Sequence, residues 1–250
     1  MSVGHPLIHL GYAYELSSRD IAMEALAHAA TAHNYLHKYF DEPSYTMLGT
    51  HSTTSLLNIL ERVTGDTRFD GLFEEAGYDN IDVLFKDHED LVLEYWNMWT
   101  LPNPKEQFEA SQHLATCLLA ATQRPGKNSY NFFLVHLLTT SHAVRIMLPV
   151  IPSKFHVSLV RQWWLLTLAV YIALLRPTIT PGLIDDYDSG DRMWSWIDKQ
   201  SVESSWALDA HYIKALRAMK EAASTWGDKD SFYLKAAVKF AEQFDGWSFL

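Results

Sequence analysis

Near its start the chain reads GHPLIHLGYAYE, residues 4–15. Pro6 has a fixed φ and no backbone N–H, so it suits the first turn of an α-helix. On the helix that follows, His9 shares a face with Tyr12, because residues three and four apart are neighbours on a helix surface. His5 stands directly ahead of the proline. An imidazole on such a face is either a core histidine or a metal ligand, and only the rest of the chain can decide between these roles.

The helical periodicity continues outward along nearly the whole chain. It predicts further helices over residues 18–40, 53–64, 80–96, 104–123, 129–148, 153–176, 204–226 and 229–244, with one long irregular stretch over 178–204. Clean two-residue alternation and hairpin dipeptides are both absent from the sequence. We therefore predict an all-α fold, a compact multi-helix array with no sheet. Without a linker rich in Gly, Ser or Pro, it is expected to form a single domain over residues 1–250.

Composition excludes several classes of protein. The chain has 250 residues, of which 48% are hydrophobic, and its formal net charge is −10. No basic surplus is present to neutralise phosphates, so we expect no nucleic-acid partner. The most apolar run, Trp163–Leu175, is shorter than the roughly 20 residues of a membrane span, so we predict no membrane span. The lack of a signal-peptide pattern and the single cysteine, Cys117, favour a cytoplasmic protein in which that cysteine is a small buried hydrophobe and not a nucleophile.

A second candidate site lies in the segment ALDAHYIKAL, residues 207–216. His211 and Lys214 are three residues apart and share a helix face with small alanines. A lysine on a tightly packed face is costly unless it is neutral, paired or ligating. If its amine reacted with carbon dioxide, the carbamate would place an oxygen ligand beside an imidazole, a set that suits iron, manganese or zinc. The alternative is a lysine whose amine reaches out to solvent.

The third candidate site lies in YNFFLVHLLTT, residues 130–140, where His136 occupies an apolar helix. Taken alone, such a histidine is usually a core residue. However, His9, His136 and His211 each lie on the apolar face of a different helix, and helical bundles build metal sites from such positions. We therefore expect these three side chains to converge on one metal ion, toward which Lys214 also points.

Other patterns in the sequence give no further candidate site. His33 and His37 are four residues apart, but their surroundings are rich in alanine and favour a surface pair. The glycine patterns of dinucleotide and P-loop sites are absent from the sequence, as is the nucleophile elbow of serine hydrolases. A nucleotide-binding Rossmann domain and a serine hydrolase are therefore both disfavoured.

Three segments together resemble the questin oxidase-like family of fungal secondary-metabolite oxygenases. They are HPLIHLGY at 5–12, FFLVHLLT at 132–139 and DAHYIK at 209–214. The resemblance covers essentially the whole chain. It implies an all-helical monooxygenase or dioxygenase that opens a ring of an anthraquinone-type aromatic polyketide, a Baeyer–Villiger-like outcome, with molecular oxygen and with NADPH as the reductant.

The same resemblance suggests the metal and its ligands. Because oxygen chemistry is implied, we choose a non-haem iron held by His9, His136 and His211, with Lys214 as a carbamate ligand or a supporting partner. His5 either ligates this ion or only caps its helix. The residues alone would equally allow zinc or manganese.

Proteins of this family are considerably longer, and their extra length precedes the His-Pro-x-x-His segment. The chain is therefore expected to correspond to the carboxy-terminal portion, with a further ligand histidine in the preceding part. Apolar surface near residues 1–20 is then expected to be exposed, or buried in a homo-oligomer or against a missing amino-terminal half. The rival function is a non-catalytic helical module that binds an apolar ligand or a partner chain.

Overall fold

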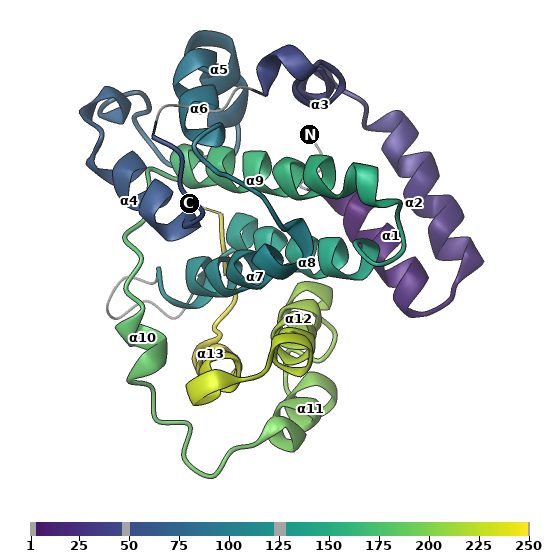
Figure 1. Cartoon of the computed structure of the whole chain (residues 1–250). Coiled ribbons are helices and arrows are strands. Elements are labelled where there is room, and N and C mark those ends of the chain that lie inside the picture. Colours follow the sequence, from purple (N-terminus) through teal and green to yellow (C-terminus); the bar gives the residue numbers. More distant parts are fainter. Residues whose placement is uncertain (1–3, 47–50, 123–128, 250) are drawn as a thin grey trace. The chain divides into compact units, whose positions relative to one another are not determined.

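The computed structural model describes residues 4–46, 51–122 and 129–249, and its regular structure is almost entirely helical (Figure 1). Within those ranges, β-structure is limited to one pair of two-residue strands and an isolated bridge between Thr53 and Trp99. The all-α prediction is therefore confirmed. The chain divides into two compact units, which we call the first unit (Met1–Ser111 with Ala143–Pro177) and the second unit (Gln112–His142 with Thr178–Phe249). A single domain over residues 1–250 stays a prediction.

The first unit begins with two antiparallel helices in contact, α1 (His5–Glu15) and α2 (Arg19–Thr31). Pro6 lies in the first turn of α1, as its fixed φ predicted. The side chain of Ser18 caps α2 by accepting a hydrogen bond from the backbone of Ile21. Figure 1 shows the pair in purple, joined by a tight turn.

Two helices of the first unit are shorter than the sequence predicted. The helix expected over 18–40 ends at Thr31, because Asn34 accepts a hydrogen bond from the backbone of Leu36, 2.9 Å away, and starts a separate 3₁₀ turn. The helix expected over 80–96 is interrupted at His88, whose φ of −136° is not helical. Both errors arose because apolar periodicity continued across a local break in the backbone.

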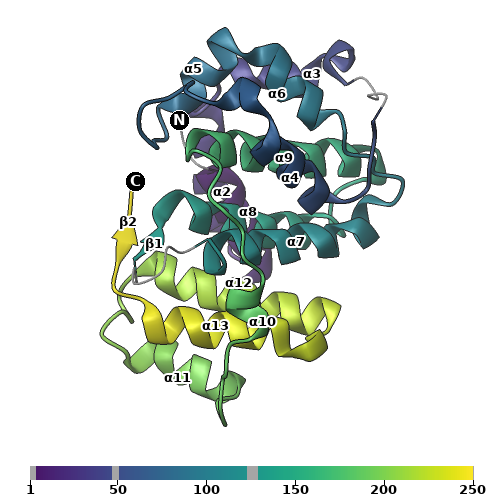
Figure 2. The same cartoon turned by 90° about the vertical axis from the view of Figure 1, so that its left-hand side faces the viewer.

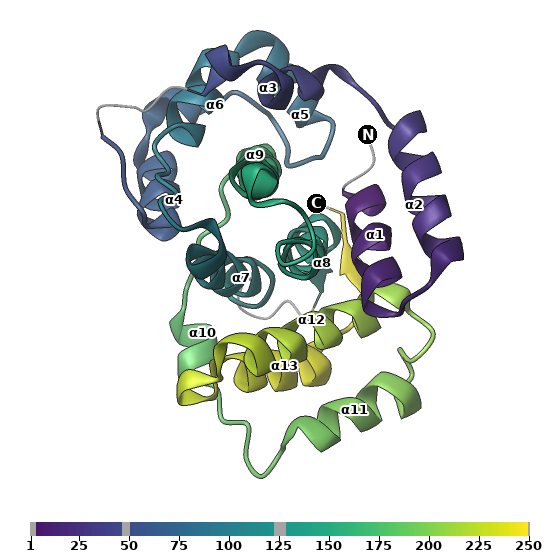
Figure 3. The ribbon, with the colours of Figure 1, turned by 45° about the vertical axis from the view of Figure 1, so that its right-hand side comes forward.

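The rest of the first unit surrounds α9 (His156–Ala173), the apolar helix that the sequence predicted. Most of α9 is buried, and α5 and α6 contact it. Figure 3 looks almost along its axis, with α4, α5 and α6 around it. The remaining elements are α3 (Lys38–Asp41), α4 (Leu56–Gly65), α5 (Asn80–Asp87) and α6 (Glu89–Trp96), with 3₁₀ turns at Tyr35–His37, Pro43–Tyr45, Thr67–Phe69 and Ser153–Phe155. Among the described helices, none has the length and apolar character needed to cross a membrane.

Two helices contribute residues to both units, because the division falls within α7 (Pro104–Ala120) and within α8 (Phe132–Met147). The predicted end of α7 at Gln123 lies outside the described residues. Helix α8 begins three residues later than the sequence predicted, since Asn131 caps it by accepting hydrogen bonds from the backbone N–H groups of the second and third helical residues. This cap fixes the start of the helix that carries His136.

The residues before α8 form strand β1 (Tyr130–Asn131), which pairs in parallel with β2 (Trp247–Ser248) (Figure 2). The other elements of the second unit are α10 (Gly182–Asp185), α11 (Trp194–Glu203), α12 (Ala210–Trp226) and α13 (Phe232–Gln243), with a 3₁₀ turn at Lys229–Ser231. Helices α12 and α13 pack together, and α11 contacts both. The prediction of irregular structure over 178–204 is wrong for α10 and α11. Only Ile197 of α11 is buried, so its sequence carries little apolar periodicity.

Candidate functional site

Two histidines of the second unit lie close together. His136 on α8 is completely buried, and His211 lies in the first turn of α12, with 4.9 Å between their ring centres. Two imidazoles on one ion, with metal–nitrogen bonds of about 2.1 Å, have ring centres about 4.5–5.2 Å apart at octahedral to tetrahedral angles. The structure thus brings together two of the three histidines that the sequence singled out, at a spacing that suits ligands of one ion.

The ring of His136 is oriented by its own helix. Its Nδ1 lies 2.7 Å from the carbonyl oxygen of Phe132, one turn earlier on α8. A carbonyl can only accept, so Nδ1 donates and Nε2 is the nitrogen able to bind a metal. Hydrogen bonds of this kind fix both the tautomer and the direction of a ligating histidine.

His211 is positioned by the cap of α12. Asp209 accepts hydrogen bonds from the backbone of His211 (2.8 Å) and of Tyr212 (3.0 Å), and its second oxygen accepts one from the indole of Trp247 (2.8 Å). Burial lowers the pKa of His211, the charge of Lys214 lowers it further, and Asp209 opposes both. The neutral imidazole, which is the form that binds metals, is therefore favoured.

Aromatic rings enclose the two imidazoles. The ring of Phe132 is centred 4.7 Å from that of His136 and 4.6 Å from that of His211. Trp247 lies 6.2 Å from His211, and Phe249 lies 4.8 Å from Phe132. These three rings, which we call the aromatic wall, are tilted against one another and form an apolar surface of a kind that suits aromatic ligands.

Lys214, one turn after His211 on α12, is half-buried and not fully solvated. Burial lowers its pKa below the usual value of a lysine. A lowered pKa increases the fraction of neutral amine, the form that reacts with carbon dioxide. Its role as a ligand, directly or as a carbamate, stays a prediction.

The first unit holds a separate group of histidines on α1 and α2. The ring centres of His5, His9 and His28 form a nearly equilateral triangle with sides of 6.2, 6.3 and 6.4 Å. Nδ1 of His9 also lies 3.4 Å from a carboxylate oxygen of Glu24. The sequence analysis missed Glu24 and His28, although their spacing of four residues places them on one face of α2. The role of His9 as a partner of His136 and His211 stays a prediction.

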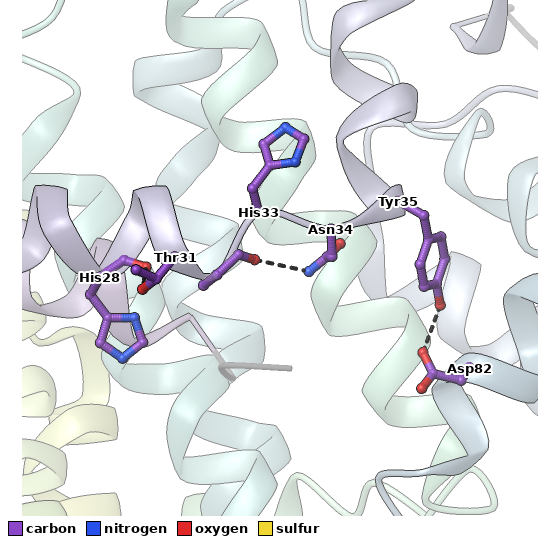
Figure 4. A pocket seen from close by; sticks show the side chains of 7 residues that line it. His28, Thr31, His33, Asn34, Tyr35 and Asp82 are labelled. Atoms are coloured by element: carbon purple, nitrogen blue, oxygen red, sulfur yellow. Dashed lines mark hydrogen bonds between the residues drawn. The ribbon is translucent and has the colours of Figure 1, made fainter.

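A pocket of about 450 Å³ opens beside the end of α2, and His28 is part of its wall. Its far side carries Tyr35, whose hydroxyl donates to Asp82 at 2.8 Å (Figure 4). In the same view His28 and His33 extend to opposite sides of the chain. His33 is exposed and stacks on His37 at 4.0 Å, so the predicted surface pair is confirmed.

Cys117 on α7 is buried, as predicted. Burial raises the pKa of its thiol to about 12. The thiolate form that a nucleophile requires is therefore strongly disfavoured, and the side chain serves as a small apolar core residue.

The questin oxidase-like family model matches residues 1–219. The chain belongs to the questin oxidase-like family. Among curated proteins none matches the sequence. Within this questin oxidase-like chain, the matched region includes α1 and α2 as well as His136 and His211, whereas α13 and β2 follow it. The family match thus agrees with the resemblance that the three histidine-bearing segments carried.

Proposed function

We propose that this questin oxidase-like chain is an oxygenase, or the larger part of one. Its substrate would be an anthraquinone-type aromatic polyketide of secondary metabolism, of which it opens a ring. The observation that carries the proposal is the pair formed by the buried His136 and the half-buried His211, whose ring centres lie 4.9 Å apart beside the ring of Phe132. This arrangement combines a ligand pair for a redox metal with a surface for an aromatic substrate.

We propose a non-haem iron as the metal, held by His136 and His211, with His5 as a third ligand as the sequence prediction allowed. Support comes from the close approach of α1 to α8 in the first unit, where a Cβ on Gly11 would lie 2.7 Å from Ala143. His5 precedes the glycine by about 9 Å of helix and His136 precedes the alanine by about 10 Å.

His9 and Lys214 are the further candidates for this ion. Both carry over from the sequence prediction, and Lys214 would serve as an amine or as a carbamate. His211 and Lys214 are one turn apart on α12, which makes a joint role for these two side chains feasible.

When bound, the iron would supply a position at which molecular oxygen is activated. The surrounding residues orient the two histidine rings and the substrate. Phe132 offers a flat face to an aromatic substrate and holds the His136 ring through its carbonyl oxygen. Asp209 fixes the start of α12 and thereby the direction of His211. NADPH is the reductant that the family resemblance implies, and we place the reaction in the cytoplasm, where a lone cysteine remains reduced.

The iron content of the purified protein tests this proposal. We expect about one iron atom per chain, lost in both His136→Ala and His211→Ala, with metal affinity reduced at least about 100-fold. Oxygen uptake in the presence of an anthraquinone and NADPH should also fall in both variants, because the iron is lost.

A matched control is His156→Ala. His156 is also buried, at 8% exposure, and its Nε2 lies 3.1 Å from the backbone carbonyl of Ile151, yet it is on α9 and outside the pair. The control should keep its iron. A wild-type chain that binds no iron and melts cooperatively would favour the rival function, a non-catalytic helical binding module.

A further inference from the structure

We infer that His9, Glu24 and His28 form a second binding site, for a divalent transition-metal ion, on the surface of the α1–α2 pair. All three side chains belong to the first unit. None of them is a ligand in the set of His5, His136 and His211 proposed above. The inference assigns His9 to this second ion instead of to the first.

The distances come close to those of ligands that share one ion. Nδ1 of His9 lies 3.4 Å from the Glu24 carboxylate, and two donor atoms on one tetrahedral zinc ion are about 3.3 Å apart. The ring centres of His9 and His28 are 6.3 Å apart. Two imidazoles on one ion can be separated by at most about 6.4 Å, and a tetrahedral angle needs about 5.2 Å. An approach of about 1 Å, which rotation of partly exposed side chains can supply, completes the geometry.

Two ring nitrogens at this place lack a hydrogen bond. Nδ1 of His9 and Nδ1 of His28 are both shielded from solvent, and within the described ranges neither has a hydrogen-bond partner. A shielded polar atom without a partner is unfavourable, and native structures usually satisfy it. A metal ion bound by both nitrogens would remove this cost.

The donor set selects the class of ion. Two imidazoles and one carboxylate suit Zn²⁺, Fe²⁺, Co²⁺, Ni²⁺ or Cu²⁺, whereas Ca²⁺ and Mg²⁺ prefer oxygen ligands alone. His28 also lines the pocket of about 450 Å³ shown in Figure 4, so water can reach its ring from that side. Remaining positions on the ion would be filled by water.

Zinc titration of the metal-free full-length chain tests the site, with bound zinc counted after equilibrium dialysis. We expect about two ions for the wild type, about one for His28→Ala, about one for His136→Ala and none for the double variant. The conservative Glu24→Gln should weaken the second site by at least about tenfold. Substitution with Co²⁺ gives a second readout, a visible absorption band that His28→Ala should remove.

The matched control is His33→Ala, which removes an exposed histidine beside the end of α2 and should still bind both ions. Because Ala25 is the buried residue of α2, His28→Ala should fold, which far-UV circular dichroism can check. The inference is overturned if His28→Ala binds as much zinc as the wild type, or if His33→Ala loses the ion instead. If only the proposed function is wrong, the wild type binds one ion, which His136→Ala keeps and His28→Ala loses.

Discussion

Two pairs of consecutive helices, α1–α2 and α12–α13, pack closely against each other and differ sharply in burial. Helices α12 and α13 bury seven and eight residues, whereas α1 buries three and α2 buries only Ala25. Because stability grows with the apolar area removed from water, the α12–α13 pair contributes mainly to the core. The α1–α2 pair leaves most of its side chains accessible to solvent and to ions.

The same difference separates the two groups of histidines. His136 is completely buried, and His211, at the start of α12, lies against it and against Phe132. His211 is itself half-buried, as are His9 and His28 on α1 and α2, so only the first group contains a completely buried imidazole. Burial favours a neutral imidazole and restricts access, while partial exposure permits exchange with solvent. A tightly held ion is therefore expected at the first place and a more readily exchanged ion at the second.

The largest expected effect of a single substitution on stability concerns α13. Lys239 is 4% exposed and donates to the backbone carbonyl of Ala120 at 3.0 Å. Burial lowers its pKa to about 8 from 10.5. Between these values the unfolded chain binds more protons than the folded one, so the free energy of unfolding should rise with pH, by up to roughly 3 kcal/mol. In Lys239→Met this contribution should vanish, which urea unfolding at pH 7 and pH 10 would measure.

The matched control on the same helix is Lys235→Met. The amine of Lys235 is at the surface, where it donates to the carbonyl of Asp185 at 2.7 Å. This variant should retain the wild-type dependence on pH. Equal pH dependence in Lys239→Met and the wild type would show that burial of the Lys239 amine does not lower the free energy of unfolding. The contrast between the α12–α13 pair and the α1–α2 pair would then be smaller than we infer.

A smaller effect on the free energy of unfolding is expected at Gly11, where α1 packs closely against α8. A Cβ on Gly11 would lie 2.7 Å from both Cα and Cβ of Ala143, so Gly11→Ala must push α1 away from α8. Overpacking of this kind costs typically about 1–3 kcal/mol, and we expect about 2 kcal/mol from chemical denaturation. The control is Gly65→Ala in α4, where nothing lies within 4 Å of an added Cβ. It should be neutral or stabilise by up to about 1 kcal/mol; an equal loss in both variants would contradict close packing of α1.

The smallest effect should belong to α2. Leu26 is 60% exposed, so Leu26→Ser should change the free energy of unfolding by no more than about 0.5 kcal/mol. Leu216 on α12 is completely buried, and Leu216→Ser should destabilise the chain by several times as much. Differential scanning calorimetry of the two variants makes the comparison directly. A large loss in Leu26→Ser would mean that this leucine is covered in solution, as an oligomer interface would require.

The sequence predicts a helix correctly where the residues of that helix carry a clear local pattern. Pro6 marks the start of α1, and the apolar pattern of α9 is strong enough to identify a buried helix. The breaks at Asn34 and His88 were missed because apolar periodicity runs through them. Helix α11 was missed because a helix with one buried residue carries almost no periodic signal.

Candidate site residues were also easier to recognise on apolar helices than on exposed ones. His136 and His211 were recognised because an imidazole on an apolar helix is conspicuous. Glu24 and His28 lie on a mostly exposed, alanine-rich helix, where histidine and glutamate are ordinary surface residues. Their relation to His9 depends on how α1 and α2 pack, and that contact is not encoded in the spacing of either helix alone.

The short β1–β2 pair has a consequence for the order of folding. It joins Tyr130 to Trp247, residues far apart in the sequence, and Trp247 also donates to the cap of α12 through Asp209. Closing so long a loop lowers the entropy of the chain before the new contact can stabilise it. Such pairings therefore form late in folding. During refolding, helical circular dichroism should therefore recover before the indole of Trp247 reaches its final environment. The aromatic wall around His136 and His211 would then be among the last parts of the second unit to assemble.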